Sequence, residues 1–212
     1  MIKKLTLLLA AISVAASSAF AGASIYDSFV IVNGTFYDIG SNTSNADYGT
    51  SLGEFDTTMS ITLGGQQKSS KDNGTDVTGH QLLFRIFQGA PGPTQPFSTI
   101  NYGFQWNQGD TGAPGNLNNA GDQQWGTDVQ GANTVSDAIT LSLAGFDPGV
   151  YTLEVYSQIT TDGTNAAATI FNNQGGSNYR AAFTVVPEPS SLSLLAGPAI
   201  LGAWFFVRRR RA

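Results

Sequence analysis

The run Phe55-Asp56-Thr57-Thr58-Met59-Ser60-Ile61-Thr62-Leu63 alternates between mostly apolar and polar residues. Successive side chains of a β-strand point to opposite faces of the sheet, so this period of two predicts one half-buried strand. The same period recurs in four further places: Tyr102/Phe104/Trp106, Ile139/Leu141/Leu143, Tyr151/Leu153/Val155 and Tyr179/Ala181/Phe183/Val185. Residues 22–186 contain no sustained helical period, so this part of the chain is predicted to be all-β.

Turn signals separate the alternating runs. Asn33-Gly34 lies between the apolar runs 29–32 and 35–39, and Asn-Gly between two such runs predicts a hairpin with a type I′ turn. Asp147-Pro148-Gly149 predicts a tight turn into a strand, and residues 172–176 separate the last two strands. Some eight to ten short strands predict a β-sandwich or jelly roll over residues 22–186.

The composition of this predicted domain is acidic. Residues 22–186 carry 14 acidic and 4 basic side chains, a formal charge of about −10. This charge disfavours nucleic acid and anionic lipid as partners. The chain has no cysteine, which excludes disulfides, thiol catalysis and thiolate metal sites.

Candidates for catalysis are few. His80 is the only histidine and no Gly-x-Ser-x-Gly motif occurs, so we interpret His80 as a surface or strand-entry residue without a catalytic role. Glu54 and Asp56, or Glu154, could form the carboxylate pair of a glycosidase, but alternation with Leu153 and Val155 predicts Glu154 on the solvent face. No catalytic residue is assigned, and the protein is not expected to be an enzyme.

Two loops could bind a ligand. Residues 108–131 are rich in glycine and asparagine and are predicted to form a surface loop that carries Trp125, a possible glycan contact. No metal ligand is assigned. Calcium is the one cofactor left open, because oxygen donors cluster in residues 72–76 and in the long loop. The donors in the long loop are Asp110, Asn116, Asn118, Asn119 and Asp122.

The N-terminus has the form of a signal peptide. Lys3 and Lys4 precede an apolar stretch over residues 5–16, and Ala19-Phe20-Ala21 has the small-x-small form of a signal peptidase site. Cleavage is predicted after Ala21, which assigns residues 1–21 to the signal. The alternative is an uncleaved membrane anchor.

The C-terminus, residues 187–212, has three parts. Val186-Pro187-Glu188-Pro189 is followed by a mostly apolar segment over residues 190–207 and then by the cluster Arg208, Arg209, Arg210 and Arg211. Prolines hold the intervening Glu188 in an extended conformation outside the helix. The apolar segment is at the short limit for a membrane helix, and the arginines favour the cytoplasmic side of an inner membrane.

This tail resembles the PEP-CTERM family of exported bacterial surface proteins, whose tails are read by the membrane transpeptidase exosortase. The resemblance is confined to the tail and implies processing near Pro-Glu-Pro in a Gram-negative-type bacterium. It implies transient residence in the inner membrane, then the cell surface or the extracellular space. It also implies a setting of exopolysaccharide or biofilm.

Three hypotheses for the exported domain follow. The leading one is a non-enzymatic surface or extracellular-matrix protein that is handled by signal peptidase and exosortase. The second is a carbohydrate-binding or adhesin module that uses Trp125. The third is a hydrolase that uses the acidic residues.

Overall fold

The computed structural model describes residues 22–40, 49, 51–72, 74–89, 95–133 and 138–188. Within them the chain is all-β, and its one helical element is a short 3-10 turn, η1 (Gln174–Gly176). None of the described residues forms a helix long and apolar enough to span a membrane. The predicted signal peptide and the predicted helix at 190–207 lie outside the described residues.

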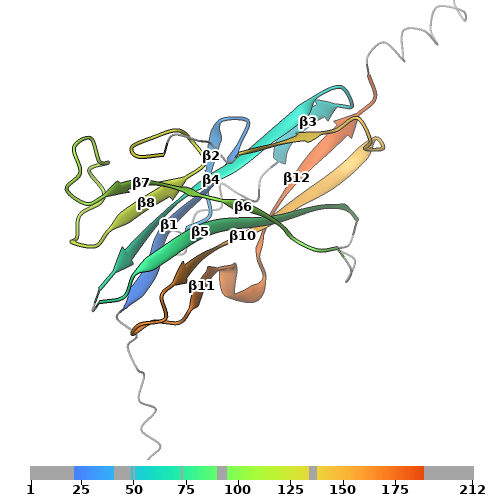
Figure 1. Ribbon diagram of the computed structural model, residues 1–212. Helices are drawn as coiled ribbons and strands as arrows, with labels where there is room; N and C mark the ends of the chain where they lie inside the picture. Colours follow the sequence, from blue (N-terminus) through green and yellow to red (C-terminus); the bar gives the residue numbers. More distant parts are fainter. Residues whose placement is uncertain are drawn as a thin grey trace, which may run out of the picture.

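Within the described residues, twelve strands form two six-stranded sheets, as predicted for a β-sandwich (Figure 1). The first sheet, here sheet A, has the order β2-β1-β4-β8-β7, and β9 also pairs with β4. Its strands are β1 (Ala23–Val32), β2 (Thr35–Asp38), β4 (Ser60–Lys71), β7 (Gly103–Asn107), β8 (Gln123–Gly126) and β9 (Ile139–Ser142).

The second sheet, sheet B, has the order β3-β12-β10-β5-β6, and β11 also pairs with β10. Its strands are β3 (Ser51–Asp56), β5 (Val77–Gln88), β6 (Ser98–Asn101), β10 (Gly149–Thr161), β11 (Thr169–Asn172) and β12 (Tyr179–Val186). Every described pairing is antiparallel except that of β3 with β12, which is parallel.

The predicted Asn-Gly hairpin is confirmed. Val32 pairs with Thr35 across a two-residue turn in which Asn33 has φ 49° and Gly34 has φ 80°. Positive φ at both central residues is the requirement of a type I′ turn. The Asn33 side chain also accepts a hydrogen bond from the backbone N–H of Thr62, 2.7 Å away, which ties the turn to β4.

The prediction of a single strand over residues 55–63 is wrong. The run is divided between β3 of sheet B and β4 of sheet A, and Met59 is exposed. The carboxylate of Asp56 accepts hydrogen bonds from the backbone N–H and the hydroxyl of Thr58, and so closes a turn between the strands. The alternating pattern continues across this turn because both strands face the same core.

The core fills the space between the sheets. It contains the aromatic set Phe55, Tyr151 and Phe183, in which Tyr151 stacks on Phe183 at 5.6 Å between ring centroids. Its aliphatic members without exposed surface include Val30, Leu63, Leu82 and Leu153. These residues come from strands of both sheets, so burial of their side chains holds the sandwich together.

The described chain starts and ends at opposite ends of the sandwich (Figure 1). Ala23 at the start of β1 pairs with Lys71, where β4 turns toward β5. Val185 near the end of β12 pairs with Gly149, at the start of β10. Ala23, at the start of β1, and residue 186, at the end of β12, are therefore separated by the length of the sheets.

Candidate functional site

A polar pocket lies at the end of sheet A where β1 begins. Its volume is about 560 Å³, within the range of small-molecule sites. It is lined by Ser24, Tyr26, Asp27, Ser70, Asn116, Asn118, Asn119 and Asp122. The lining residues come from β1, from the end of β4 and from the loop between β7 and β8, and we call this the end pocket.

A β-bulge in β1 shapes the wall of the end pocket. The register between β1 and β4 shifts between Ile25 and Asp27, which leaves Tyr26 as the extra residue. A bulge of this kind re-aims a side chain and bends the strand. Beside it, the Ser24 and Ser70 hydroxyls are 2.7 Å apart. Sequence reasoning missed this wall, although the adjacent large residues Ile25 and Tyr26 interrupt the alternation.

Lys68 neutralises one of the two carboxylates of the pocket. Its ammonium group lies 2.8 Å from Oδ2 of Asp27, and its side chain is 6% exposed. The same ammonium lies 5.8 Å from the ring centroid of Phe29, within reach of a cation–π contact. The charge of Asp27 is thus balanced inside the protein.

Asp122, in the loop between β7 and β8, lies in the other wall of the end pocket. Its Oδ2 accepts hydrogen bonds from the backbone N–H groups of Asn118, at 3.0 Å, and Asn119, at 2.9 Å. The side chain is almost completely buried, including its Oδ1. The carboxylate is therefore fixed through one oxygen, while the other is shielded from bulk water.

The buried hydroxyl of Tyr26 lies close to the Asp122 carboxylate and interacts with it. Burial is the largest cause that raises the pKa of Tyr26. The negative charge of Asp122 and a hydrogen bond to its carboxylate raise it further, and the charge of Asp27 adds the smallest contribution. Tyr26 is therefore a neutral hydrogen-bond donor at ordinary pH. The Tyr26 hydroxyl and the Asp122 carboxylate therefore interact with each other beneath the surface of the pocket.

The structure brings together four of the five oxygen-donor residues of the long loop for which calcium was left open. Asn116, Asn118, Asn119 and Asp122 line the end pocket, whereas Asp110 accepts a hydrogen bond from the Asn107 backbone N–H at 2.7 Å. In the other predicted segment, Asp76 pairs with Lys71. Among the described residues, no three histidine, cysteine, aspartate or glutamate side chains are grouped as metal ligands.

Trp125 does not lie in a surface loop, so that prediction is wrong. Residues 108–131 contain β8, and Trp125 pairs with Gln67 of β4 in the middle of sheet A. Its half-buried indole stacks on His80, with ring centroids 5.0 Å apart, and contacts Phe104 edge-on. The proposed glycan contact of Trp125 is not tested by this placement, but the ring packs against the core.

His80 is not a surface residue either. It lies in β5 and is 1% exposed, between Gln67 Oε1, 2.8 Å from Nδ1, and Ser69 Oγ, 3.0 Å from Nε2. Gln67 in turn donates to the hydroxyls of Ser28 and Ser157. Burial lowers the pKa of His80 to about 3, so the ring is neutral. This network joins the two sheets.

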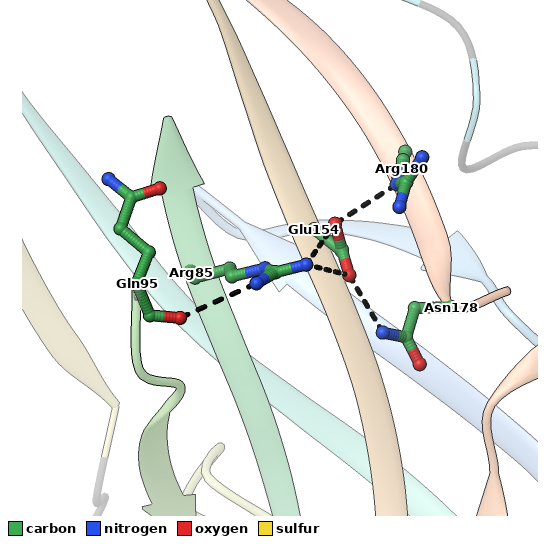
Figure 2. A network of polar contacts seen from close by, with 5 residues as sticks. All are labelled: Arg85, Gln95, Glu154, Asn178 and Arg180. Carbon is green, nitrogen blue, oxygen red and sulfur yellow. Dashed lines mark hydrogen bonds and ion pairs between the residues drawn. The ribbon is translucent and has the colours of Figure 1, made fainter. Parts of the chain in front are cut away.

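Glu154 points to the outer face of sheet B, as alternation predicts, but it is not solvated there. Figure 2 shows its carboxylate between Arg85 and Arg180, which flank it on the neighbouring strands. Arg85 donates to both carboxylate oxygens at 2.9 and 3.1 Å, Arg180 donates at 3.0 Å, and Asn178 at 2.7 Å. The side chain has no exposed surface, because these partners cover it.

Glu154 does not lie beside Glu54 and Asp56, the other acidic residues considered for hydrolysis. Glu54 is exposed and pairs with Thr184 of β12. Glu154 pairs with Arg180, which is four positions away from Thr184 on the same strand. Asp56 is occupied in capping its own turn, and the hydrogen bonds from Thr58 lower its pKa. Glu154 and Asp56 therefore each take part in hydrogen bonds that stabilise the fold, at separate places.

Few of the predicted targeting residues can be placed. Val186 is the last residue of β12, Pro187 is exposed and Glu188 is half-buried. The other predicted residues lie outside the described parts of the chain: Ala19, Ala21, Pro189, Arg208, Arg209, Arg210 and Arg211. In comparisons with known proteins, no family model and no curated protein matches this chain.

Proposed function

We propose that this chain is an exported, non-enzymatic surface protein that exosortase processes through its C-terminal tail. Its exported part is the β-sandwich, and the tail begins at Pro187. After processing, the sandwich resides at the cell surface or in the extracellular matrix of a Gram-negative-type bacterium. Signal peptidase and exosortase are its processing partners, and the inner membrane holds it transiently through residues 190–207.

The end of β12 is the observation that supports this proposal. The last strand runs up to Val186, and the next residue, Pro187, is exposed. A proline cannot donate to a sheet ladder, so the strand cannot continue through the Pro-Glu-Pro motif. The motif therefore follows the folded domain without a linker, and an enzyme can reach it while the sandwich stays folded.

Mass analysis of the native protein tests the proposal. In a host with exosortase, we expect a mature form that begins near Gly22 and ends near Pro189. In the same host without exosortase, the form should retain Arg208–Arg211 and fractionate with the inner membrane. Replacing Pro187 and Pro189 by alanine should also block processing, whereas Pro114→Ala, in the β7–β8 loop, should not. A full-length form that is unaffected by exosortase would contradict the proposal.

A second candidate function is carbohydrate binding at the surface, and the end pocket is the observation that favours it. The pocket offers hydroxyl, amide and carboxylate groups around a ligand-sized volume. It lies at the end of the sandwich opposite to residue 186, so a domain held through its tail would present the pocket away from the membrane. This assignment moves the binding residues from Trp125 to the end pocket.

A further inference from the structure

We propose that the outer face of sheet B binds an extended polysaccharide that carries carboxylate groups. Its sugar rings stack on Phe97, Tyr156 and Phe171, here called the aromatic row, and one of its carboxylates binds Arg180. None of these residues lines the end pocket, so this is a second surface, and its role goes beyond the functions proposed above. It depends neither on processing of the tail nor on a ligand in the end pocket.

The aromatic row crosses the outer face of sheet B. Tyr156 of β10 alternates with the buried residues Val155 and Ser157, so its ring points away from the core. The centroid of this ring lies 5.0 Å from that of Phe97, just before β6, and 6.3 Å from that of Phe171 in β11. Phe97 and Tyr156 are half-buried and Phe171 is 52% exposed, so the row presents ring surface to a ligand.

A row of amide side chains runs beside the aromatic row. Gln158 of β10 pairs with Gln81 of β5, and Gln81 pairs with Asn101 of β6. The Gln158 side chain donates to that of Gln81 at 2.6 Å, and Gln81 donates to Asn101 at 2.9 Å. These bonds orient the amides, and they leave the amide oxygen of Gln158 and the amide nitrogen of Asn101 able to bind a ligand.

Two arginines lie in the opposite direction along the strands. They flank Glu154, which is two positions before Tyr156 in β10 (Figure 2). Arg85 is fixed between this carboxylate and Phe97, with its guanidinium carbon 4.5 Å from the ring centroid. Arg180 is 50% exposed and donates to Glu154 through Nε, so its two terminal nitrogens can bind a further acceptor.

The charge beside the aromatic row is opposite in sign to that of the domain. Residues 22–186 carry 14 acidic and 4 basic side chains, but here two guanidinium groups share the one carboxylate of Glu154. The exposed Glu54 pairs with Thr184, about 13 Å along β12 from Arg180, so it does not compensate the second guanidinium. A planar guanidinium binds a carboxylate through two parallel hydrogen bonds, so the surface favours an acidic ligand.

A sugar polymer fits this surface better than a protein or a nucleic acid. Sugar rings have apolar C–H faces that pack on aromatic rings, and hydroxyl groups at their edges that bond to amides. A stable protein interface buries about 800 Å² on each partner around an apolar centre, whereas polar side chains flank the narrow aromatic row on both sides. The acidity of the whole domain disfavours nucleic acid, the other polyanion that stacks on aromatic rings.

Retention of the full-length chain on immobilised polygalacturonate, with dextran as the neutral polymer, tests the proposal. A zwitterionic detergent is used, because glycoside detergents themselves carry a sugar. The tail cluster can bind a polyanion, so every chain in the comparison carries Arg208→Gln, Arg209→Gln, Arg210→Gln and Arg211→Gln. We expect binding to polygalacturonate to be at least about tenfold tighter than to dextran, and to weaken as salt is added.

Phe171→Ala should weaken binding to polygalacturonate about fivefold, because one exposed stacking ring is lost. Phe36→Ala is its matched control, since Phe36 is 44% exposed on β2 of the other sheet. Arg180→Gln should weaken binding about tenfold. Lys71→Gln is the control for Arg180→Gln, because it removes the same charge from a surface ion pair of sheet A. Asn119→Ala, in the end pocket, should leave binding unchanged.

Four outcomes would overturn the proposal. The first is no retention of the parent chain on polygalacturonate, and the second is equal retention on dextran. The third is retention that neither Phe171→Ala nor Arg180→Gln changes, including loss in Asn119→Ala alone, which would place the ligand in the end pocket. The fourth is self-association in light scattering that both variants abolish, without retention, which would identify a second copy as the occupant. Tail processing is read separately by mass, so its failure is recognised independently.

Discussion

The imidazole of His80 and the indole of Trp125 stack across the two sheets, with ring centroids 5.0 Å apart and planes 14° from parallel. His80 belongs to β5 of sheet B and Trp125 to β8 of sheet A, and Phe104 packs edge-on against the same indole at 5.3 Å. The contact therefore joins the sheets at a position where the core also contains polar groups. Stability is the first property expected to depend on it.

Truncation of Trp125 should destabilise the sandwich. Trp125→Ala is expected to lower the free energy of unfolding by about 3 kcal/mol, because a large ring leaves a cavity beside His80 and Phe104. Phe171→Ala is the control, since Phe171 is 52% exposed, and its change should stay within about 1 kcal/mol. Urea unfolding of both variants provides the measurement. Unchanged stability of Trp125→Ala together with lost glycan retention would instead favour a binding role.

Acid should destabilise the protein through its single histidine. The pKa of His80 is lowered by burial from 6.5 to about 3, so the unfolded chain binds a proton more readily than the folded one. This contribution to stability is complete above about pH 6.5 and is lost as the pH falls toward 3. The expected slope is about 1.4 kcal/mol per pH unit within that window.

Urea unfolding between about pH 6.5 and 5 isolates this effect, since carboxylates titrate mainly below that range. The chain has only one histidine, so His80→Gln should abolish the slope, although it lowers stability at neutral pH. A stability that does not change over this interval in the parent would mean that the folded protein accepts a charged His80.

The strands and turns could be predicted from the sequence more completely than the surroundings of individual side chains. The Asn33-Gly34 turn and the strand after Asp147-Pro148-Gly149 are local features, because the required φ values and the alternation are written in adjacent residues. The division of residues 55–63 between sheets was missed because both strands face one core. Only the distant pairing partners of β3 and β4 distinguish the two sheets.

Burial of polar residues could not be predicted, because their partners are distant in sequence. His80 and Glu154 were assigned to the surface, yet Gln67 covers one and Arg85 and Arg180 cover the other. Alternation gave the correct face for Glu154 but not its exposure, which depends on the neighbouring strands.

The candidate site was half predicted. The oxygen-rich residues 116–122 were recognised from composition, because asparagine and aspartate cluster there. The opposite wall, with Tyr26 and Asp27, depends on a bulge that appears only when β1 pairs with β4. No local pattern in the loop indicates which strand it covers.

Removal of the Glu154 charge should destabilise the folded protein. Burial alone would raise the pKa of Glu154, but hydrogen bonds from Asn178 and Arg85 and the charges of Arg180 and Arg85 outweigh it, so the pKa is lowered. Glu154→Ala leaves Arg85, which is 17% exposed, without its partner. Breaking a buried ion pair in this way is expected to lower the free energy of unfolding by about 3–5 kcal/mol.

Asp76→Asn is the matched control for this charge removal. Its ion pair with Lys71 is at the surface, with side chains 58% and 31% exposed, so the expected loss is below about 1 kcal/mol. Chemical denaturation at pH 7 compares the two variants. Equal, small effects would mean that solvent or a rearranged Gln95 replaces Glu154 as the partner of Arg85.

Substitution of Gly34 tests whether the hairpin turn depends on backbone conformation alone. Gly34 has φ 80°, and an added Cβ would meet no atom within 4 Å, so Gly34→Ala introduces strain without a clash. The left-handed conformation is expected to cost an L-residue about 1–2 kcal/mol in the free energy of unfolding. Gly145 has the same open surroundings without a positive φ, so Gly145→Ala should be neutral or stabilising by up to about 1 kcal/mol. Thermal unfolding of the pair separates the two effects, and equal melting temperatures would show that the 33–34 turn changes type without loss of stability.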